Sequence, residues 1–310
     1  MPRVLGLDPG TLSIDVCGLD DGALFVDETI STTLLTAADE VLALMDSAGP
    51  VDLIVGPSGY GLPLVTIDAV GERELALAFL PSRNDGIGLS GLRTLVRRLR
   101  DARLPVVFAP GVIHLPTIPL HRKINRIDLG TADKVCAAAL AIHDQAARFG
   151  IGPAETAFVL VELGGAFTAV LGVESGAIVD GAGGSSGPPG RLSAGALDAE
   201  VACLLGRVGK EVVFSGGAAY VAGAPDSSPE ALATATEPAA VRARTMLVEG
   251  VVKAVATQLA IMAPVREILL SGRLAGIAGF FEPVAAALAR YGPVRLVSSF
   301  ARRAREAAQG

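Results

Sequence analysis

The segment VLGLDPGTLSIDVCGLDDGALFVDE, residues 4–28, decides the fold. Its apolar runs alternate with turn residues, so it predicts three short strands joined by two tight turns. Asp8 and Gly10 lie at the first bend, and Asp-Asp-Gly forms the second. The segment therefore predicts an antiparallel meander with an acid and a glycine at its first turn.

Residues 157–180, AFVLVELGGAFTAVLGVESGAIVD, repeat this pattern. At a constant offset of 154 residues (162 − 8), Glu162 takes the place of Asp8 and Gly164 takes the place of Gly10. Chance similarity of two hairpins is the alternative, but the shared register and turn chemistry favour duplication. The further matches are Val16 with Val170, Gly18 with Gly172, Gly22 with Gly176 and Ala23 with Ala177.

Each meander is followed by a pattern of helix, strand, helix and strand, which predicts an α/β protein with two mixed sheets flanked by helices. We expect one domain over 1–135 and a second over 136–310, with a cleft between them. In the first half the expected elements are a helix at 36–48, a strand at 51–56, a helix at 89–102 and a strand at 105–110. The later ones are a connecting helix at 131–149, then helix 239–262, strand 266–272, helix 277–290 and strand 293–298.

The composition excludes several classes of protein. The chain is 51% hydrophobic with a mean hydropathy of +0.51, yet no apolar run is long enough for a membrane span. The net charge is −6 and no basic tract is interleaved with aromatic residues, so nucleic acid is not an expected partner. We expect Cys17, Cys136 and Cys203 to be reduced core residues of a cytoplasmic protein, and residues 300–308 to form a terminal helix with a solvated face.

The two hairpin turns suggest phosphate binding. A glycine at a bend presents backbone N–H groups to an anion and lets a phosphate approach closely. An adjacent acid can hold Mg²⁺ directly or through water, which gives Asp8 and Glu162 a metal-binding role. Turn capping by Asp8 and pairing of Glu162 with an Arg are the alternatives. The other candidate phosphate ligands are Gly10, Thr11, Ser13, Gly164 and Gly165, although Ser13 could simply face solvent.

The densest polar segment is HLPTIPLHRKINRIDLGTADK, residues 114–134. His121, Arg122 and Arg126 could orient an anionic acceptor, and Asp128 could act as base for a hydroxyl acceptor. The alternative is an exposed loop in which Asp128 caps the next helix. For Asp133 we favour a purely structural place in the first turn of that helix.

Two glycine-rich segments follow the second hairpin. Arg191 lies in GAGGSSGPPGRLSAG, residues 181–195, where a guanidinium could stabilise a transferring phosphoryl group. A flexible linker is the alternative. The segment FSGGAAYVAG, residues 214–223, reads as a loop after a strand, with Gly216 and Gly217 beside the nucleotide or the acceptor. Residues 224–239 read as a surface excursion.

Three motifs resemble those of the superfamily of acetate and sugar kinases, chaperone ATPases and actin (ASKHA). GLDPGT (6–11) resembles its first phosphate loop, ELGGAFT (162–168) its second, and LLSGRLAG (269–276) its adenosine loop. The resemblance implies two duplicated domains of the ribonuclease-H-like, actin-like ATPase fold. It also implies that Ser271, Gly272 and Arg273 bind the nucleotide.

Within this superfamily the chain is most similar to the acetate and butyrate kinase branch, including an uncharacterised butyrate kinase-like family. The similarity rests on residues 162–195 and on Pro-Leu-His at 119–121. The chain departs from acetate kinases at Glu162, where they have His, and at Arg273, where a second Gly is expected. Leu192 also interrupts the Arg-Ser-Gly signal after Arg191.

The resemblance implies a kinase that binds Mg-ATP and phosphorylates a small molecule, with a short-chain carboxylate as the first candidate. A hydroxyl acceptor is a second reading, which a functional Asp128 would favour. A regulatory protein that binds nucleotide and hydrolyses it slowly or not at all is a third, favoured by Glu162. The expected partners are the nucleotide and the acceptor, with a homodimer allowed and no membrane.

Overall fold

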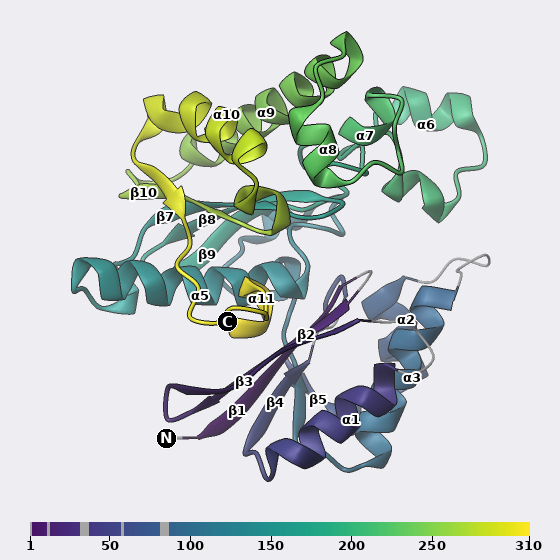
Figure 1. Ribbon diagram of the computed structural model, residues 1–310, viewed down its shortest axis with the longest axis vertical. Coiled ribbons are helices and arrows are strands. Elements are labelled where there is room, and N and C mark those ends of the chain that lie inside the picture. The colour runs from purple at the N-terminus through teal and green to yellow at the C-terminus, as the bar shows by residue number, and fades with distance from the viewer. Residues whose placement is uncertain (1, 11–12, 32–36, 57–58, 81–86) are drawn as a thin grey trace. The chain divides into compact units, whose positions relative to one another are not determined.

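The computed structural model describes residues 2–10, 13–31, 37–56, 59–80 and 87–310 (Figure 1). They form two compact units. Unit 1 comprises Met1–Leu115, Thr131–Leu140 and Ser299–Gly310, and unit 2 comprises Pro116–Gly130 and Ala141–Ser298. The boundary that we expected at residue 135 falls within helix α5 (Ala132–Phe149). The predicted ligand Thr11 and the predicted start of a helix at 36 lie outside the described residues.

Unit 1 contains a six-stranded mixed sheet in the order β3-β2-β1-β4-β6-β5. One face of this sheet packs against α1, α2 and α3, with Val41, Leu75 and Leu95 buried in the shared core (Figure 1). The strands are β1 (Arg3–Pro9), β2 (Ser13–Asp20), β3 (Ala23–Ser31), β4 (Leu53–Gly56), β5 (Val65–Thr66) and β6 (Val106–Phe108). The helices are α1 (Ala37–Ala48), α2 (Glu72–Phe79) and α3 (Ile87–Asp101), with 3-10 turns η1 (Ile67–Ala69) and η2 (Val112–His114).

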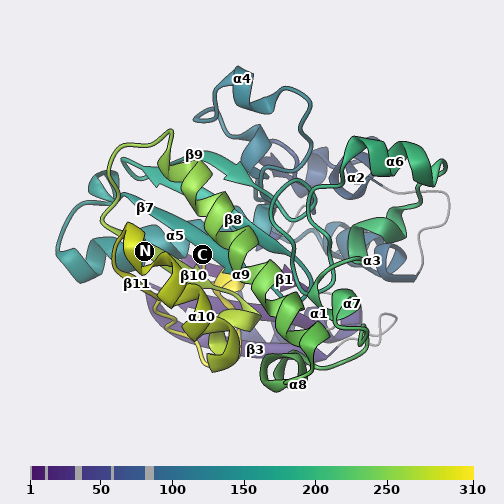
Figure 2. The ribbon, with the colours of Figure 1, turned by 90° about the horizontal axis from the view of Figure 1, so that it is seen from above.

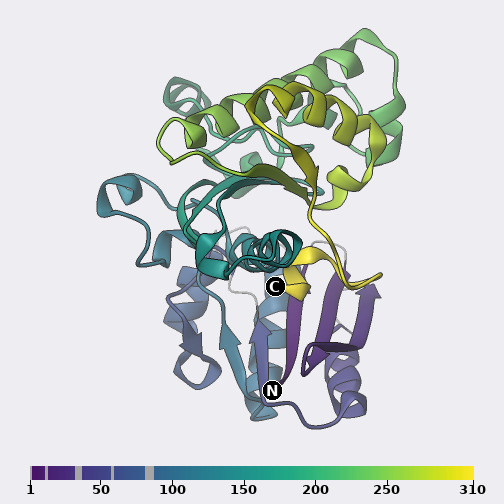
Figure 3. The ribbon, with the colours of Figure 1, turned by 90° about the vertical axis from the view of Figure 1, so that its left-hand side faces the viewer.

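Unit 2 contains a five-stranded mixed sheet in the order β11-β10-β7-β8-β9. Helices α9 and α10 cover one face, with α9 running over β8 (Figure 2), and α5 lies on the other face (Figure 3). The strands are β7 (Phe158–Leu163), β8 (Thr168–Glu174), β9 (Ala177–Ala182), β10 (Glu267–Ser271) and β11 (Val294–Leu296). The helices are α4 (Leu120–Lys123), α6 (Ala199–Leu205), α7 (Ala218–Val221), α8 (Pro229–Thr234), α9 (Pro238–Leu259) and α10 (Ala278–Leu288). The 3-10 turns are η3 (Pro153–Glu155), η4 (Lys210–Phe214), η5 (Arg273–Gly276) and η6 (Ala289–Tyr291). None of the described helices is both long and apolar enough to cross a membrane.

The two sheets have the same topology, which confirms the predicted duplication. The order β3-β2-β1-β4-β6 of unit 1 corresponds to β9-β8-β7-β10-β11 of unit 2. Only the short edge strand β5 of unit 1 has no counterpart among the described strands of unit 2. The predicted fold class, α/β with two mixed sheets, is therefore confirmed.

The hairpins agree in detail. The register between β2 and β3 shifts after Gly18, and that between β8 and β9 shifts after Gly172, at the predicted offset. The second turn has positive φ at both central residues in each copy: 51° and 81° at Asp21 and Gly22, and 52° and 72° at Ser175 and Gly176. Such pairs of positive φ are typical of two-residue type I′ hairpin turns, which favour glycine at the second place.

Several expectations from the sequence are wrong. Residues 210–214 form the 3-10 turn η4 rather than a strand, and the excursion at 224–239 contains α8, whose Leu232 is buried. Cys203 is exposed on α6, although Cys17 is buried as expected. Helices α2, α6 and α8 are short, with eight residues or fewer, so no long apolar period marks them in the sequence.

The C-terminal segment 299–310 is not the solvated helix that we expected. Its only helix is the four-residue α11 (Glu306–Gln309), and Ala301, Ala304 and Ala308 are buried with Cys17 on the second face of the unit 1 sheet. A Cβ on Gly6 would lie 2.1 Å from the carbonyl oxygen of Ala308, so this close contact requires glycine. Asp27 of β3 holds the segment by accepting hydrogen bonds from the backbone N–H groups of 302–304, at 2.7–2.9 Å.

A buried ionic network joins α5 to the unit 2 sheet. The guanidinium of Arg295 on β11 donates Nε to Oε2 of Glu267 at 2.7 Å and Nη2 to Oε1 at 2.8 Å. It also donates to Asp144 of α5. Glu267 further accepts from Gln145, whose side chain is fully buried. Burial alone would lower the pKa of Arg295, but the two carboxylates raise it above its ordinary value.

Replacing Arg295 with Met should destabilise unit 2. The substitution leaves the buried carboxylates of Glu267 and Asp144 without their cation, which costs about 3–5 kcal/mol in comparable sites. Urea unfolding and hydrogen exchange of β10 amides would measure the loss. The matched control is Arg242→Met on the exposed side of α9, and an unchanged midpoint in Arg295→Met would contradict the prediction.

Asp27 should make the docking of residues 299–310 depend on pH. Burial alone would raise its pKa, but the hydrogen bonds from the three backbone N–H groups and the charge of Arg303 lower it. A lowered folded-state pKa stabilises docking above the unfolded value of about 3.9, and this contribution is lost as the pH falls through the folded value. Hydrogen exchange of 299–310 should rise in that range, whereas Asp27→Asn should raise it already at neutral pH. Asp46→Asn on α1 is the control.

Candidate functional site

Asp8 and Gly10 form the first bend in unit 1. The Gly10 N–H lies 3.1 Å from the carbonyl of Asp8 and 2.8 Å from that of Ser13, which closes the turn between β1 and β2. Gly10 is exposed and Ser13 is partly exposed, so both can meet a ligand. Three of the four predicted phosphate-loop residues of unit 1 are thus together at one end of the sheet.

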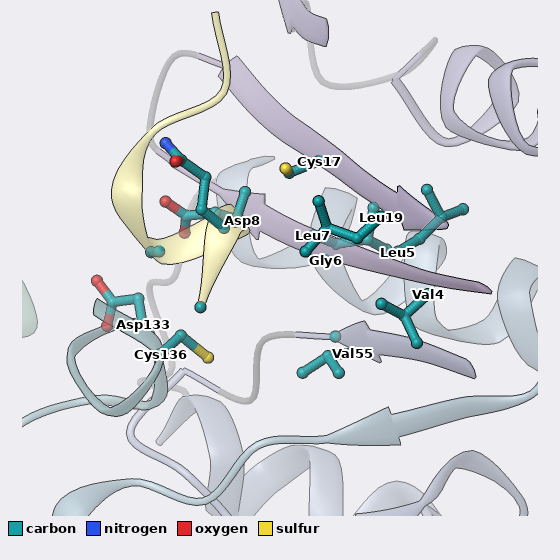
Figure 4. A pocket seen from close by; sticks show the side chains of 15 residues that line it. Val4, Leu5, Gly6, Leu7, Asp8, Cys17, Leu19, Val55, Asp133 and Cys136 are labelled. Carbon is teal, nitrogen blue, oxygen red and sulfur yellow. The ribbon is translucent and has the colours of Figure 1, made fainter. Parts of the chain in front are cut away.

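A pocket of about 130 Å³ lies beside Asp8 within unit 1 (Figure 4). Strands β1, β2 and β4, helix α5 and residues 307–310 line it. Asp8, Asp133 and Cys136 gather at one end, while Val4, Leu19 and Val55 form the apolar remainder (Figure 4). An apolar cavity of about 150 Å³ admits a molecule the size of benzene, so this pocket suits a ligand of a few heavy atoms.

Asp133 was expected to be only structural, but it lines this pocket. It accepts hydrogen bonds from Thr131 and from Lys134, whose side chain is largely buried. Burial alone would raise the pKa of Asp133, but the charge of Lys134 and these hydrogen bonds lower it. The pair therefore places an ionised acid and a cation at the start of α5. The adjacent Asp133-Lys134 in the sequence is the signal that could have indicated it.

The cysteines of the pocket are not nucleophiles at neutral pH. Burial raises the pKa of Cys136 to about 12, with further contributions from the charges of Asp133 and Asp8. Burial likewise raises the pKa of Cys17 to about 12. Since the thiolate is the reactive form, both side chains act as apolar wall.

The predicted second phosphate loop, in unit 2, has the same turn as the predicted first loop in unit 1. The Gly164 N–H donates to the carbonyl of Phe167 at 2.9 Å, as Gly10 does to Ser13. Glu162 lies beneath this loop, at the end of β7 and directly across from Ser271 of β10. A Cβ on Gly164 would lie 3.1 Å from Glu162 Oε1, so the acid and the bend are in close contact.

The predicted adenosine loop begins at the end of β10, beside Glu162 of β7. Gly272 has φ of +88°, and a Cβ there would lie 2.6 Å from Glu162 Oε1, so the position requires glycine. The hydroxyl of Ser271 is buried and, among the described residues, has no hydrogen-bond partner. Arg273 follows on η5 and is exposed, with its Cδ 3.8 Å from the place of a Cβ on Gly165.

Arg191 contacts the predicted second phosphate loop directly. Its Nε donates to the carbonyl of Gly165 at 2.8 Å, and its Nη1 donates to that of Ser227 at 2.8 Å. Partial burial lowers the pKa of Arg191, the positive charge of Arg273 lowers it further, and Glu230 opposes this. The structure thus brings three predicted residues, Arg191, Gly165 and Arg273, to one place.

Residues 183–195 are a packed loop rather than a flexible linker. A Cβ on Gly184 would lie 2.6 Å from the ring of Phe167, and one on Gly190 would lie 2.4 Å from the carbonyl of Ala166. Ala166 also accepts the backbone N–H groups of Leu192 and Ser193 at 3.0 and 3.1 Å. Loop 183–195 is therefore packed against Ala166 and Phe167 on both sides of Arg191.

Gly216 and Gly217 lie against the same loop. Gly216 forms a bridge with Ser193, and the Gly217 N–H donates to the carbonyl of Leu192 at 2.7 Å. Because the Gly217 amide is already bonded to this carbonyl, we assign this segment to supporting the Arg191 loop.

Asp128 is a buried anchor for this loop. Its Oδ2 accepts from the N–H and the hydroxyl of Ser185, both at 2.9 Å, and its Oδ1 accepts from the Gly130 N–H at 3.0 Å. Its backbone carbonyl accepts from Ser186. A Cβ on Gly183 would lie 1.8 Å from Oδ1. This arrangement suits a positioning role better than that of a general base.

The basic residues next to Asp128 have a different environment. Arg122 donates to the carbonyl of Val179 at 2.6 Å and so caps the exposed edge of β9. His121 and Arg126 are exposed on the loop that carries α4, which projects from the rest of unit 2 (Figure 2). They are available to attract an anion, but the structure does not bring them to Arg191.

Several solved structures with a similar fold are described as kinases. A propionate kinase from Francisella tularensis matches with a TM-score of 0.71 at 12% identity, covering 100% of this chain and 98% of that chain. An acetate kinase from Porphyromonas gingivalis matches with 0.62 at 16% identity over 92% and 86% of the two chains. A ROK hexokinase from Thermus thermophilus matches with 0.52 at 20% identity over 99% and 96%. No curated protein matches the sequence significantly.

The duplicated sheets, the two glycine bends and these matches show that the chain has the two-domain α/β fold of these acetate, propionate and sugar kinases. The chain belongs to the family described as "Protein of unknown function (DUF1464)", whose model matches residues 6–310. The fold that the superfamily resemblance implied is therefore confirmed.

Replacing Asp128 with Ala should loosen the Arg191 loop. The substitution leaves the N–H of Ser185 and that of Gly130 without their acceptor and opens space beside Gly183. We expect faster hydrogen exchange across 183–195 and a stability loss of about 1–3 kcal/mol. Asp226→Ala, an exposed acid of unit 2, is the control. Unchanged exchange in the Asp128 variant would refute the anchoring role.

Proposed function

We propose that this protein is a small-molecule kinase that uses Mg-ATP as phosphoryl donor, with a short-chain carboxylate as acceptor. The observation that carries the proposal is the contact of Arg191 with the carbonyl of Gly165 in a bend that repeats the bend at Gly10. Backbone N–H groups and a guanidinium at one loop are what phosphoryl transfer requires, because its charge is spread over oxygens. We further propose a cytoplasmic location, where Mg-ATP is available.

The chemistry of the acids fits Mg²⁺, although no group of three or more potential ligands gathers among the described residues. Mg²⁺ is commonly held by one or two carboxylates together with water and phosphate oxygens, so a single carboxylate, Asp8 in unit 1 or Glu162 in unit 2, suffices as the protein donor. When bound, the ion would neutralise charge on the phosphates. In this proposal Gly10, Ser13, Gly164 and Gly165 bind phosphate, and Arg191 stabilises the transferring group.

The proposed acceptor, a short-chain carboxylate, is supported by the apolar walls of the pocket beside Asp8 and by the Asp133–Lys134 ion pair. The apolar walls of Val4, Leu19 and Val55 suit a short aliphatic chain. Lys134 compensates the charge of Asp133 in this pocket, which reduces the penalty for an anionic acceptor. In our proposal His121 and Arg126 raise the local concentration of anions rather than contact the acceptor. The Asp128 carboxylate already accepts three hydrogen bonds, which disfavours it as a general base. A hydroxyl acceptor, which would need such a base, is therefore disfavoured as well.

The decisive measurement is thermal unfolding with and without Mg-ATP, followed by transfer assays on acetate, propionate and butyrate. A ligand at about 100 times its Kd adds about 2.7 kcal/mol of stability, so the midpoint should rise. Asp8→Ala should reduce the shift, whereas Asp46→Ala on α1 should retain it. Acyl phosphate formation would support the carboxylate, and stabilisation without turnover on acids or alcohols would support a regulatory protein. No shift at millimolar nucleotide would reject the kinase proposal.

A further inference from the structure

The loop that carries α4, residues 116–127 of unit 2, presents three large aliphatic side chains to solvent. Leu120 is 82% exposed, Ile124 is 67% exposed and Ile127 is 61% exposed. Figure 2 shows that α4 projects from the rest of unit 2. Single exposed apolar residues are ordinary on protein surfaces, but three of them on one short projecting loop indicate an interaction surface.

This exposure does not come from a loosely attached loop, because loop 116–127 is fixed to the sheet of unit 2. Thr117 Oγ1 donates to the carbonyl of Ile178 at 2.6 Å, and Arg122 Nη1 donates to the carbonyl of Val179 at 2.6 Å. At the C-terminal end of the loop, the carboxylate of Asp128 accepts three hydrogen bonds. The aliphatic side chains are therefore held in solvent by an anchored backbone.

The charge of loop 116–127 is of one sign. Its sequence PTIPLHRKINRI contains Arg122, Lys123 and Arg126, with His121 beside them, and no acidic residue. The side chains of His121 and Arg126 are exposed together with the aliphatic ones. The surface that covers this loop should therefore be apolar in part and negatively charged around its apolar part.

An anionic lipid bilayer has both properties. Aliphatic side chains enter the boundary between headgroups and acyl chains, while the charged ends of Lys and Arg stay among the lipid phosphates. Each basic residue close to an anionic leaflet adds to the attraction. A protein partner would need a groove that accepts three aliphatic side chains and places acids around them, whereas a bilayer offers this combination at every point of its surface.

We propose that loop 116–127 is a membrane-docking tip that binds the surface of an anionic phospholipid bilayer. Leu120, Ile124 and Ile127 enter the bilayer, and the basic groups of the loop contact the lipid phosphates. This inference goes beyond the proposed function, which requires no membrane. It replaces our expectation that no membrane is a partner: docking on the surface needs no spanning segment, and none of the described helices could form one.

Tryptophan fluorescence tests the insertion of the tip. The chain contains no tryptophan, so Leu120→Trp supplies a single reporter. With vesicles of equal parts phosphatidylcholine and phosphatidylglycerol, its emission should shift to shorter wavelength, because the indole moves from water into the apolar boundary. Leu204→Trp on α6 is the matched control. Leu204 is 86% exposed, but α6 begins at the acids Asp198 and Glu200, so its emission should not shift.

Sedimentation of the full chain with the same vesicles measures the affinity. Ile124→Asp should weaken binding by about ten- to a hundredfold, because an inserted aliphatic group is replaced by a charge that the lipids repel. Added salt should weaken binding of the native protein, since it screens the basic groups. Ile124 is exposed, so the variant should keep the melting temperature of the native protein.

The outcomes are distinct. Binding to anionic vesicles that Ile124→Asp weakens, with the shift at Leu120→Trp, supports the docking tip. The proposal is refuted if the native protein does not bind anionic vesicles, if it binds pure phosphatidylcholine equally well, or if Ile124→Asp binds as tightly as the native protein. A native dimer that Ile124→Asp converts to a monomer, without vesicle binding, would assign the tip to a second copy instead. These readouts involve no nucleotide, so the kinase proposal is tested separately.

Discussion

The hydrogen bond across the first bend of each meander is the constraint on which the candidate site depends. Gly10 donates to Ser13 in unit 1 and Gly164 donates to Phe167 in unit 2, at nearly the same distance. This bond turns the chain sharply just after an acid, so that a carboxylate and the glycine of the bend stand at the same end of the sheet. The repeated β-bulge after Gly18 and Gly172 shows that the whole meander, and not only its bend, has been duplicated.

In unit 2 the bend at Gly164 is surrounded by loops that are held in place by their contacts with it. Glycine makes this possible, because Gly184, Gly190 and Gly272 approach a ring, a carbonyl and a carboxylate more closely than a side chain would allow. The Asp128 carboxylate accepts hydrogen bonds from the Gly130 N–H and from the N–H and hydroxyl of Ser185, so these polar groups are satisfied. Loop 183–195, which resembles a linker in composition, therefore supports Arg191. This support depends on Asp128, a buried polar group whose hydrogen bonds must all be kept.

Buried charges elsewhere follow the same rule. Arg295 satisfies Glu267 and Asp144 beneath the unit 2 sheet, and Lys134 satisfies Asp133 at the start of α5. The network around Arg295 has a purely structural setting, whereas Asp133 lines the pocket beside Asp8. Only the location in the fold distinguishes the two, since both consist of acids and bases with low exposure. Within the part of the chain that the structure describes, no acid forms an ion pair with Arg191 or Arg273, which distinguishes their site from the other two.

The sequence by itself determined the duplication, the α/β class and the positions of both glycine bends, because these depend on local turn chemistry and on strand periodicity that repeat at one offset. It did not reveal that Asp133 faces the pocket with Asp8, that Asp128 is an anchor, or that residues 299–310 return to the unit 1 sheet. Those features depend on contacts between residues far apart in the chain, such as Asp27 with the amides of 302–304 and Asp128 with Ser185. Only the tertiary structure decided them, because a side chain's role is set by which partners satisfy its charge and hydrogen bonds.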